Sequence, residues 1–312
     1  MPLKQEWEED DNKQENSVEE VREEPSMSIL LAAIQSMQKE MTKEIKGVKD
    51  ELKFVKDELK SMNGKLGEKE SAAPKEMNEI EKLKSAVRLW CSDKDEALAQ
   101  HGHISGWDVS SITSMTLLFG LTDVERDQGN HWNKDFNEDL TLWDTSNVTD
   151  VSFMFNEASS FNSDLSQWST GNCTNMRSMF QHAKSFKSDL KGWNVGKVTD
   201  MAFMFNGASS FNGDCSRWST GNCTNMHGMF QRATLFKSDL KEWNVEKVTT
   251  MKLMFEGAGS FNSDLSRWST GNCTNMYLMF DMSSYVNEAS SFNRATIKNW
   301  DLSSIKFNYN FP

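Results

Sequence analysis

The cysteines are the most chemically versatile residues of this chain, and three of them recur within one segment. The nine residues WSTGNCTNM occur at 168–176, 218–226 and 268–276, and each copy carries its cysteine in sixth place. Such a series could bind a metal, form disulfides or belong to a structural repeat. The chain has 5 cysteines, an odd number, and no C-x-x-C pair, which argues against a disulfide framework and against a zinc site built from paired cysteines.

The slot of these cysteines indicates packing rather than chemistry. Valine occupies it in the intervening segments, at Val148, Val198 and Val248. The exchange is typical of a small buried position, where a free cysteine behaves as a hydrophobe. Strands that stack about 4.8 Å apart would hold cysteines two repeats apart at about 10 Å, beyond the roughly 7 Å that a disulfide spans. The same separation is too large for two of these cysteines to bind one metal ion. Cys215, which replaces Leu165 and Leu190, leads to the same prediction.

Three other groups of residues could also carry chemistry. An aspartate recurs in every repeat, at Asp139, Asp164, Asp189, Asp214, Asp239 and Asp264. Calcium prefers carboxylate oxygens, but one aspartate per repeat supplies too few ligands, and we expect each to bond the amides of its own turn. His101 and His103 with Cys91 lack a fourth metal ligand, which favours a loop. The N-x-T sequences at Asn147, Asn172, Asn222 and Asn272 are interpreted as turn residues.

Tryptophans set the period of the chain. Six of them follow one another at intervals of 25 residues, and two more flank the series: Trp143, Trp168, Trp193, Trp218, Trp243 and Trp268, flanked by Trp107 and Trp300. A fixed period of this size is typical of a solenoid. We call each unit that starts at one of these eight tryptophans a rung.

The apolar spacing within a rung predicts one strand and one short helix. Val151, Met154, Phe155 and Ala158 fall at i, i+3, i+4 and i+7, one face of a helix of about two turns. Thr149, just before that run, is expected to cap its first amides. The segment 165–170, LSQWST, has the L-x-x-L-x-L spacing of a leucine-rich-repeat strand. The expected fold class is therefore an α/β repeat solenoid of leucine-rich-repeat type.

A coiled coil is predicted before the repeats. Apolar residues recur at steps of three and four from Met27 to Leu66, with one stutter. Acidic g positions facing basic e positions suit parallel self-association, without a defined stoichiometry. A single amphipathic helix lying on the repeats is the alternative. The predicted organisation is an acidic disordered tail (1–25), the coiled coil (26–67), a linker (68–76), a capping helix (77–100) and the solenoid (101–312).

Charge and hydropathy narrow the function classes. The net charge is −12, and residues 1–25 contribute ten acids against Lys4, Lys13 and Arg22. Without clustered bases, nucleic-acid binding is not expected. No apolar stretch reaches about 18 residues and the start lacks a basic segment followed by an apolar run, so we expect neither a membrane span nor a secretory signal. The cytoplasm is the expected location, and the cell surface is the alternative.

The rung motif W-[DNS]-[VT]-x-x-[VC]-T-x-M-x-x-M-F-x-x-A-x-x-F-N-x-D-L-S resembles the repeat of BspA-like leucine-rich repeat surface proteins, a bacterial surface-protein 26-residue repeat of unknown function. Residues 86–115 are also similar to the start of such arrays in microalgal and protist proteins. The resemblance extends from about Lys84 to the C-terminus and does not include the coiled coil. It implies protein binding or adhesion and brings no catalytic residues.

These observations predict a non-enzymatic interaction scaffold that a coiled coil multimerises. No nucleophile, phosphate-binding or paired-carboxylate motif is found, so we expect no catalytic residue, cofactor or metal. The partner is an unidentified protein. The predicted binding face, which we call the outer column, is the slot that varies from rung to rung: Ser152, Arg177, Ala202, His227, Lys252 and Tyr277. A cell-surface adhesin or coat protein and a regulator of an enzyme are the alternatives.

Overall fold

The computed structural model describes residues 78–281 and 292–305. The chain divides into two units, Met1–Lys75 and Glu76–Pro312. The predicted acidic tail, the coiled coil from Met27 to Leu66 and the linker at 68–76 all lie outside the described residues. All of the described residues belong to the second unit.

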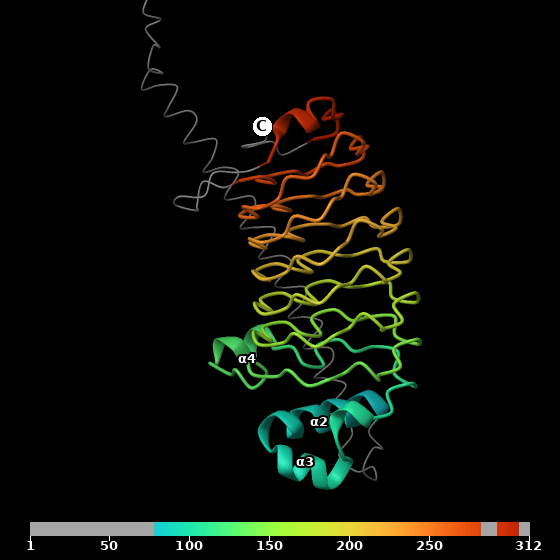
Figure 1. The fold of residues 1–312 in the computed structure, drawn as a ribbon, viewed down its shortest axis with the longest axis vertical. Helices are drawn as coiled ribbons and strands as arrows, with labels where there is room; N and C mark the ends of the chain where they lie inside the picture. The colour runs from blue at the N-terminus through green and yellow to red at the C-terminus, as the bar shows by residue number, and fades with distance from the viewer. Residues whose placement is uncertain (1–77, 282–291, 306–312) are drawn as a thin grey trace, which may run out of the picture. The chain divides into compact units, whose positions relative to one another are not determined.

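Two helices stand where the sequence predicts one capping helix at 77–100. Helix α2 spans Glu79–Ser92 and helix α3 spans Lys94–His101. Asp93 separates them, because its N–H donates to the carbonyl of Leu89 while its carboxylate accepts from the amide of Glu96. Figure 1 shows α2 and α3 at the end of the stack where the first rungs lie. Val87 and Trp90 of α2 are buried in the same core as these rungs.

The rungs stack through main-chain hydrogen bonds between equivalent residues. One residue per rung forms an isolated parallel bridge to the next, in the order Ser114, Asp150, Asn175, Asp200, Asn225, Thr250 and Asn275. Amides on either side extend the pairing: Phe153 donates to the carbonyl of Arg177 at 2.8 Å, and Phe155 to that of Met179 at 2.9 Å. Figure 1 shows the successive rungs from green to red. Residues that are 25 positions apart in the sequence therefore pair with each other in the stack.

The prediction of one helix and one strand per rung is wrong. From Trp143 to Asp281 the rungs consist of turns and single bridges. Phe153 and Glu157 have φ values of +57° and +66°, which a right-handed helix excludes. Two turns take its place, with Met154 donating to Val151 and Ala158 to Phe155. These turns repeat every four residues and turn the same side chains inward, so they imitate the helical spacing.

The expected strand at 165–170 is also a turn, closed by the amide of Trp168 on the carbonyl of Leu165 at 3.1 Å. Thr149 does not cap a helix. Its amide and its hydroxyl both donate to the carbonyl of Thr113 on the preceding rung, at 2.8 and 3.0 Å. Next to Thr149, only Asp150 forms a bridge to the neighbouring rungs, so the described rung has an isolated bridge there and not a strand.

Short helices also occur in the described part, outside the regular rungs. Helix α4, Asp123–Asp127, lies in the long segment between Trp107 and Trp143 and starts with a capping box of Thr122 and Glu125. The 3-10 helices η1 and η2 span Ile104–Gly106 and Arg294–Ile297. All three lie near the two ends of the repeat series.

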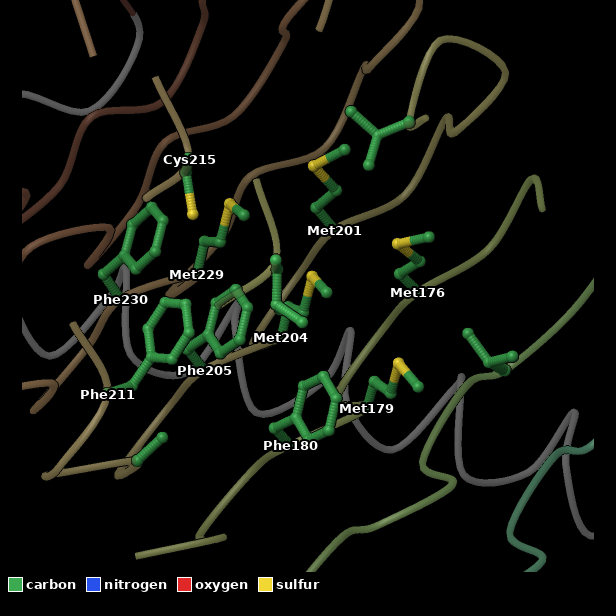
Figure 2. Close-up of a cluster of buried hydrophobic side chains, with 14 of the residues drawn as sticks. Met176, Met179, Phe180, Met201, Met204, Phe205, Phe211, Cys215, Met229 and Phe230 are labelled. Atoms are coloured by element: carbon green, nitrogen blue, oxygen red, sulfur yellow. The ribbon is translucent and has the colours of Figure 1, made fainter. Parts of the chain in front are cut away.

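Identical side chains form continuous columns in the core. The phenylalanine rings of neighbouring rungs stack, for example Phe180 on Phe205 at 5.6 Å between ring centroids. Figure 2 shows these rings beside methionines such as Met179 and Met204. The indole N–H groups of the 25-residue series donate to carbonyls of residues earlier in the chain, as Trp218 does to Leu190 at 3.0 Å. Burial of large aromatic and sulfur-containing side chains stabilises a fold that has little regular secondary structure.

Candidate interaction face

The recurring cysteines lie in the core, as the valine exchange predicts. Cys173, Cys223 and Cys273 are buried and free, and each thiol donates to a carbonyl two residues ahead in its own turn. Desolvation raises the pKa of Cys173 to about 11 and that of Cys223 to about 12. Cys215 is completely buried. At neutral pH these thiols stay protonated and are poor nucleophiles.

The aspartate column closes turns. Asp164 accepts from the amide of Ser166 at 2.9 Å, and Asp264 accepts from that of Ser266 at 3.0 Å. The side-chain and main-chain bonds from Ser216, followed by the ammonium of Lys191, lower the pKa of Asp214 to about 2. Over residues 78–281 and 292–305, no group of three or more His, Cys, Asp and Glu side chains is placed to hold a metal ion.

The histidines of the HGH sequence pack against tryptophans, but only His103 lies in the expected loop, because His101 is the last residue of α3. His103 contacts Ser105 through Nδ1 at 2.8 Å, and its ring lies edge-on to Trp90 at 5.1 Å. His101 lies edge-on to Trp107. Cys91 is half-buried, and desolvation followed by the charge of Glu138 raises its pKa to about 12. The three residues that sequence reasoning compared with a metal site therefore have separate packing partners.

A groove of about 640 Å³ lies between α2 and the start of the first rung. Leu83, Leu89, Trp107 and Ile112 contribute its apolar side chains. Asp108 in its wall is held by the hydroxyl and the amide of Ser110, at 2.7 and 2.9 Å. The groove thus offers apolar surface, and the carboxylate of Asp108 in its wall is already hydrogen-bonded within its own turn.

The outer column divides into buried and half-buried members. Ser152 and Ala202 are 5% and 0% exposed, so the expectation that they face a partner is wrong. The hydroxyl of Ser152 lies 3.3 Å from that of Thr116, and Ala202 lies on the rung between those of Arg177 and His227. Small side chains in this slot are covered by their longer neighbours. The other four members, Arg177, His227, Lys252 and Tyr277, are half-buried.

Phe203 is the residue of this face that sequence reasoning missed. Its ring is half-buried, with its centroid 4.4 Å from the His227 ring, and the Arg177 guanidinium lies 5.5 Å from it. Gly228 makes room for it: φ there is +58°, and a Cβ would lie 2.6 Å from two carbons of the Phe203 ring. The sequence does carry a sign of it: the position that follows the outer column alternates between a large and a small residue, namely Phe153, Ser178, Phe203 and Gly228.

The electrostatics of this face are dominated by cations. Burial, followed by the charges of Lys252 and Arg177, lowers the pKa of His227 to about 4, so the ring is neutral at pH 7. Its buried Nε2 forms no hydrogen bond with the described residues. Arg177 is 3.8 Å from a carboxylate oxygen of Asp200, and the Lys252 ammonium lies 5.6 Å from the Tyr277 ring centroid. Cations, aromatic rings and one unpaired ring nitrogen thus share one face.

The sequence model of the family described as "Mycoplasma protein of unknown function, DUF285" matches residues 94–218 and 204–311. Together these matches cover more than half of the chain. The chain belongs to this family. No curated protein and no solved structure gives a significant match.

The family matches begin in α3, so they include the stacked rungs and the outer column but not the segment from Met27 to Leu66. No helix among the residues that the structure describes is long and apolar enough to cross a membrane. The family description assigns no activity, which leaves the chemistry of the face itself as the guide to function.

The asparagines of the N-x-T sequences take part in the stack. The side-chain amides of Asn147, Asn172, Asn222 and Asn272 each donate to a carbonyl of the preceding rung, at 2.7 to 2.9 Å. Lys197 and Lys247 replace asparagine in this slot and donate to the amide oxygens of Asn172 and Asn222. The turn interpretation is confirmed, because all four asparagines lie in turns.

Proposed function

We propose that this protein is a non-enzymatic interaction scaffold, a leucine-rich-repeat-like solenoid whose outer column binds a partner protein. One observation carries the proposal: core slots repeat nearly unchanged, while the slot two residues after the bridge residue varies and holds the half-buried Arg177, His227, Lys252 and Tyr277. A constant frame with a varying half-exposed slot is the arrangement by which repeat proteins acquire specificity. The recurring aspartates of the rungs are engaged in turns, which favours binding over catalysis.

Self-association through Met27 to Leu66 belongs to the same proposal. The heptad spacing supports it, and joining several copies raises avidity without new contacts. Light scattering of the full chain should give a mass above that of the monomer. Replacing Leu52 and Leu59 by lysine should return it to the monomer, because both occupy predicted a positions. A monomeric wild type would contradict this part.

The binding face can be tested with the tagged full chain crosslinked in its native cells. Partners captured by the wild type should be lost from the double variant Arg177→Gln/Lys252→Gln. The matched control, Lys187→Gln/Lys237→Gln, removes the same charge from exposed positions outside the outer column. Equal loss from both variants would contradict the proposed face, and retention by both would do so as well.

The repeat motif also supports a second function, that of a BspA-like surface adhesin, and its test is separate. We propose the cytoplasm as the location. Protease treatment of intact cells should leave the tagged chain uncut, whereas cleavage would favour the adhesin. A regulator of an enzyme would instead be identified by an enzyme among the crosslinked partners.

A further inference from the structure

Four side chains on consecutive rungs form what we call the basic strip: Arg177, Phe203, His227 and Lys252. We propose that the basic strip binds an extended peptide segment in which an acidic, an apolar and a second acidic residue occupy alternate positions. This inference rests on the proposed function and names the chemistry of the partner.

Charge points to an acidic ligand. Each residue of the strip lies in one of four seven-residue segments: 172–178, 197–203, 222–228 and 247–253. Together these segments contain four basic residues, Arg177, Lys197, Lys247 and Lys252, and one acidic residue, Asp200. The chain as a whole has a net charge of −12. A locally cationic surface on an acidic protein attracts anionic segments.

The spacing fits an extended chain. Arg177 and Lys252 are three rungs apart, which corresponds to about 14 Å at the usual separation of stacked strands. Four residues of an extended peptide span about 13 Å, and their side chains alternate between two sides. Acidic residues at positions i and i+4 can therefore reach Arg177 and Lys252 together. Residue i+2 then lies between the rungs of Phe203 and His227.

The middle of the strip suits an apolar side chain. The Phe203 ring lies over Gly228, where any Cβ would collide with it, and it remains partly accessible. Next to it, His227 is neutral and its Nε2 is buried, so this ring adds no charge to the middle of the strip. A leucine-sized side chain at i+2 would cover the Phe203 ring.

Recognition must come from side chains, because the main chain under the strip is already paired. The amide of Phe203 donates to the carbonyl of His227 at 2.7 Å, and that of Gly228 to the carbonyl of Lys252 at 2.8 Å. The peptide therefore does not add a strand to a sheet edge. It lies along the stack and across its side chains, and its sequence pattern rather than its main chain determines binding.

The test measures fluorescence anisotropy of labelled peptides with the full-length protein. The first peptide has the core Asp-Ser-Leu-Ser-Asp, and the second has the same composition with its two aspartates adjacent. We expect the first to bind at least about tenfold more tightly, and to weaken as salt is raised. Equal affinity for the two peptides would overturn the proposal, because charge alone would then explain binding.

Variants locate the site. Arg177→Gln/Lys252→Gln should weaken binding of the first peptide by about tenfold or more, and Phe203→Ala should also weaken it, because the leucine loses the ring that it covers. Lys187→Gln/Lys237→Gln, the charge-matched control, should bind as the wild type does. Loss in the control equal to that in the strip variant would overturn the proposal. Tighter binding of a single-stranded oligonucleotide or of anionic vesicles would also overturn it.

Failure of this inference is separable from failure of the proposed function. If neither peptide binds but crosslinked partners still depend on Arg177 and Lys252, the interaction scaffold stands and the acidic ligand is wrong. If the strip variants retain both their fold by circular dichroism and every crosslinked partner, the proposed binding face fails as well.

Discussion

Two kinds of rung alternate along the stack, and they differ more on their surfaces than in their cores. The first kind starts at Trp143, Trp193 and Trp243 and carries valine in the slot that follows its first turn. The second kind starts at Trp168, Trp218 and Trp268 and carries cysteine there. Both kinds place tryptophan, phenylalanine, methionine and alanine in the same buried slots. The interior is therefore common to both, and the alternation has its main effect at the polar edges.

At those edges the two kinds complement each other. The side-chain amide of Asn175 donates to the carboxylate of Asp150 at 3.1 Å, and that of Asn225 donates to Asp200 at 3.3 Å. The same slot in every rung would bring identical carboxylates together if it always held aspartate. Alternation of Asp and Asn replaces that repulsion with a hydrogen bond. The unit that the stack repeats is thus a pair of rungs, which explains why WSTGNCTNM returns every 50 residues.

The largest expected effect is common to both kinds of rung. Phe205→Ala and Phe230→Ala each delete a fully buried ring that stacks between its neighbours. Each should lower the free energy of unfolding by about 3–5 kcal/mol, because a cavity replaces the lost packing. Urea unfolding followed by tryptophan fluorescence measures the loss. A much smaller loss in one kind of rung would show that the two interiors are not equivalent.

A smaller effect should separate the two kinds. Asn175→Asp places a third carboxylate between Asp150 and Asp200, and it removes the donor to Asp150. We expect a loss of about 1 kcal/mol at neutral pH. Asp150→Asn, the control, removes a charge from the same ladder and should cost less. A greater loss in Asp150→Asn would contradict the alternation argument.

The sequence identified the register of the rungs and the buried slots, because tryptophan spacing and the exchange of cysteine for valine report burial directly. It did not identify the local conformation. Val151, Met154, Phe155 and Ala158 face inward through two turns, and these have the same spacing as a helical face. The positive φ at Phe153 is decided by amides that bond to the next rung, and such contacts leave little trace in a single rung.

Only part of the candidate face was predicted, because exposure in the outer column also depends on neighbouring rungs. Varying slots are exposed only when the side chain is long enough, and this distinguishes Arg177 from the buried Ala202. The contribution of Phe203 depends on Gly228 one rung later, which is a relation between rungs. Comparing neighbouring rungs slot by slot, rather than residues along one rung, would have found it.

His227 should make stability depend on pH in a known direction. Its pKa falls from about 6.5 to about 4 on folding, so the unfolded chain binds the proton more readily. Stability should therefore decrease as pH falls from about 6.5 to about 4. Compared with His227→Gln, the wild type should lose up to about 1 kcal/mol more, a modest amount because the ring is partly solvated. Parallel pH profiles of the two proteins in chemical denaturation would reject this mechanism.

The smallest effect is expected where the sequence difference is most conspicuous. Cys223→Val installs the residue of the other kind of rung in a slot that is 0% exposed, and removes only a weak thiol bond to the carbonyl of Asn225 at 3.4 Å. The free energy of unfolding should change by well under about 1 kcal/mol, because the two side chains have similar volumes. Cys223→Ser, the control, keeps the size but places a hydroxyl in an apolar slot and should cost more.

Thiol labelling at pH 8 tests the burial of Cys223 independently. Cys223 should react only when the protein unfolds, because its pKa in the folded protein is about 12. Fast labelling of the folded protein, or a large loss in Cys223→Val, would mean that this cysteine does more than fill space.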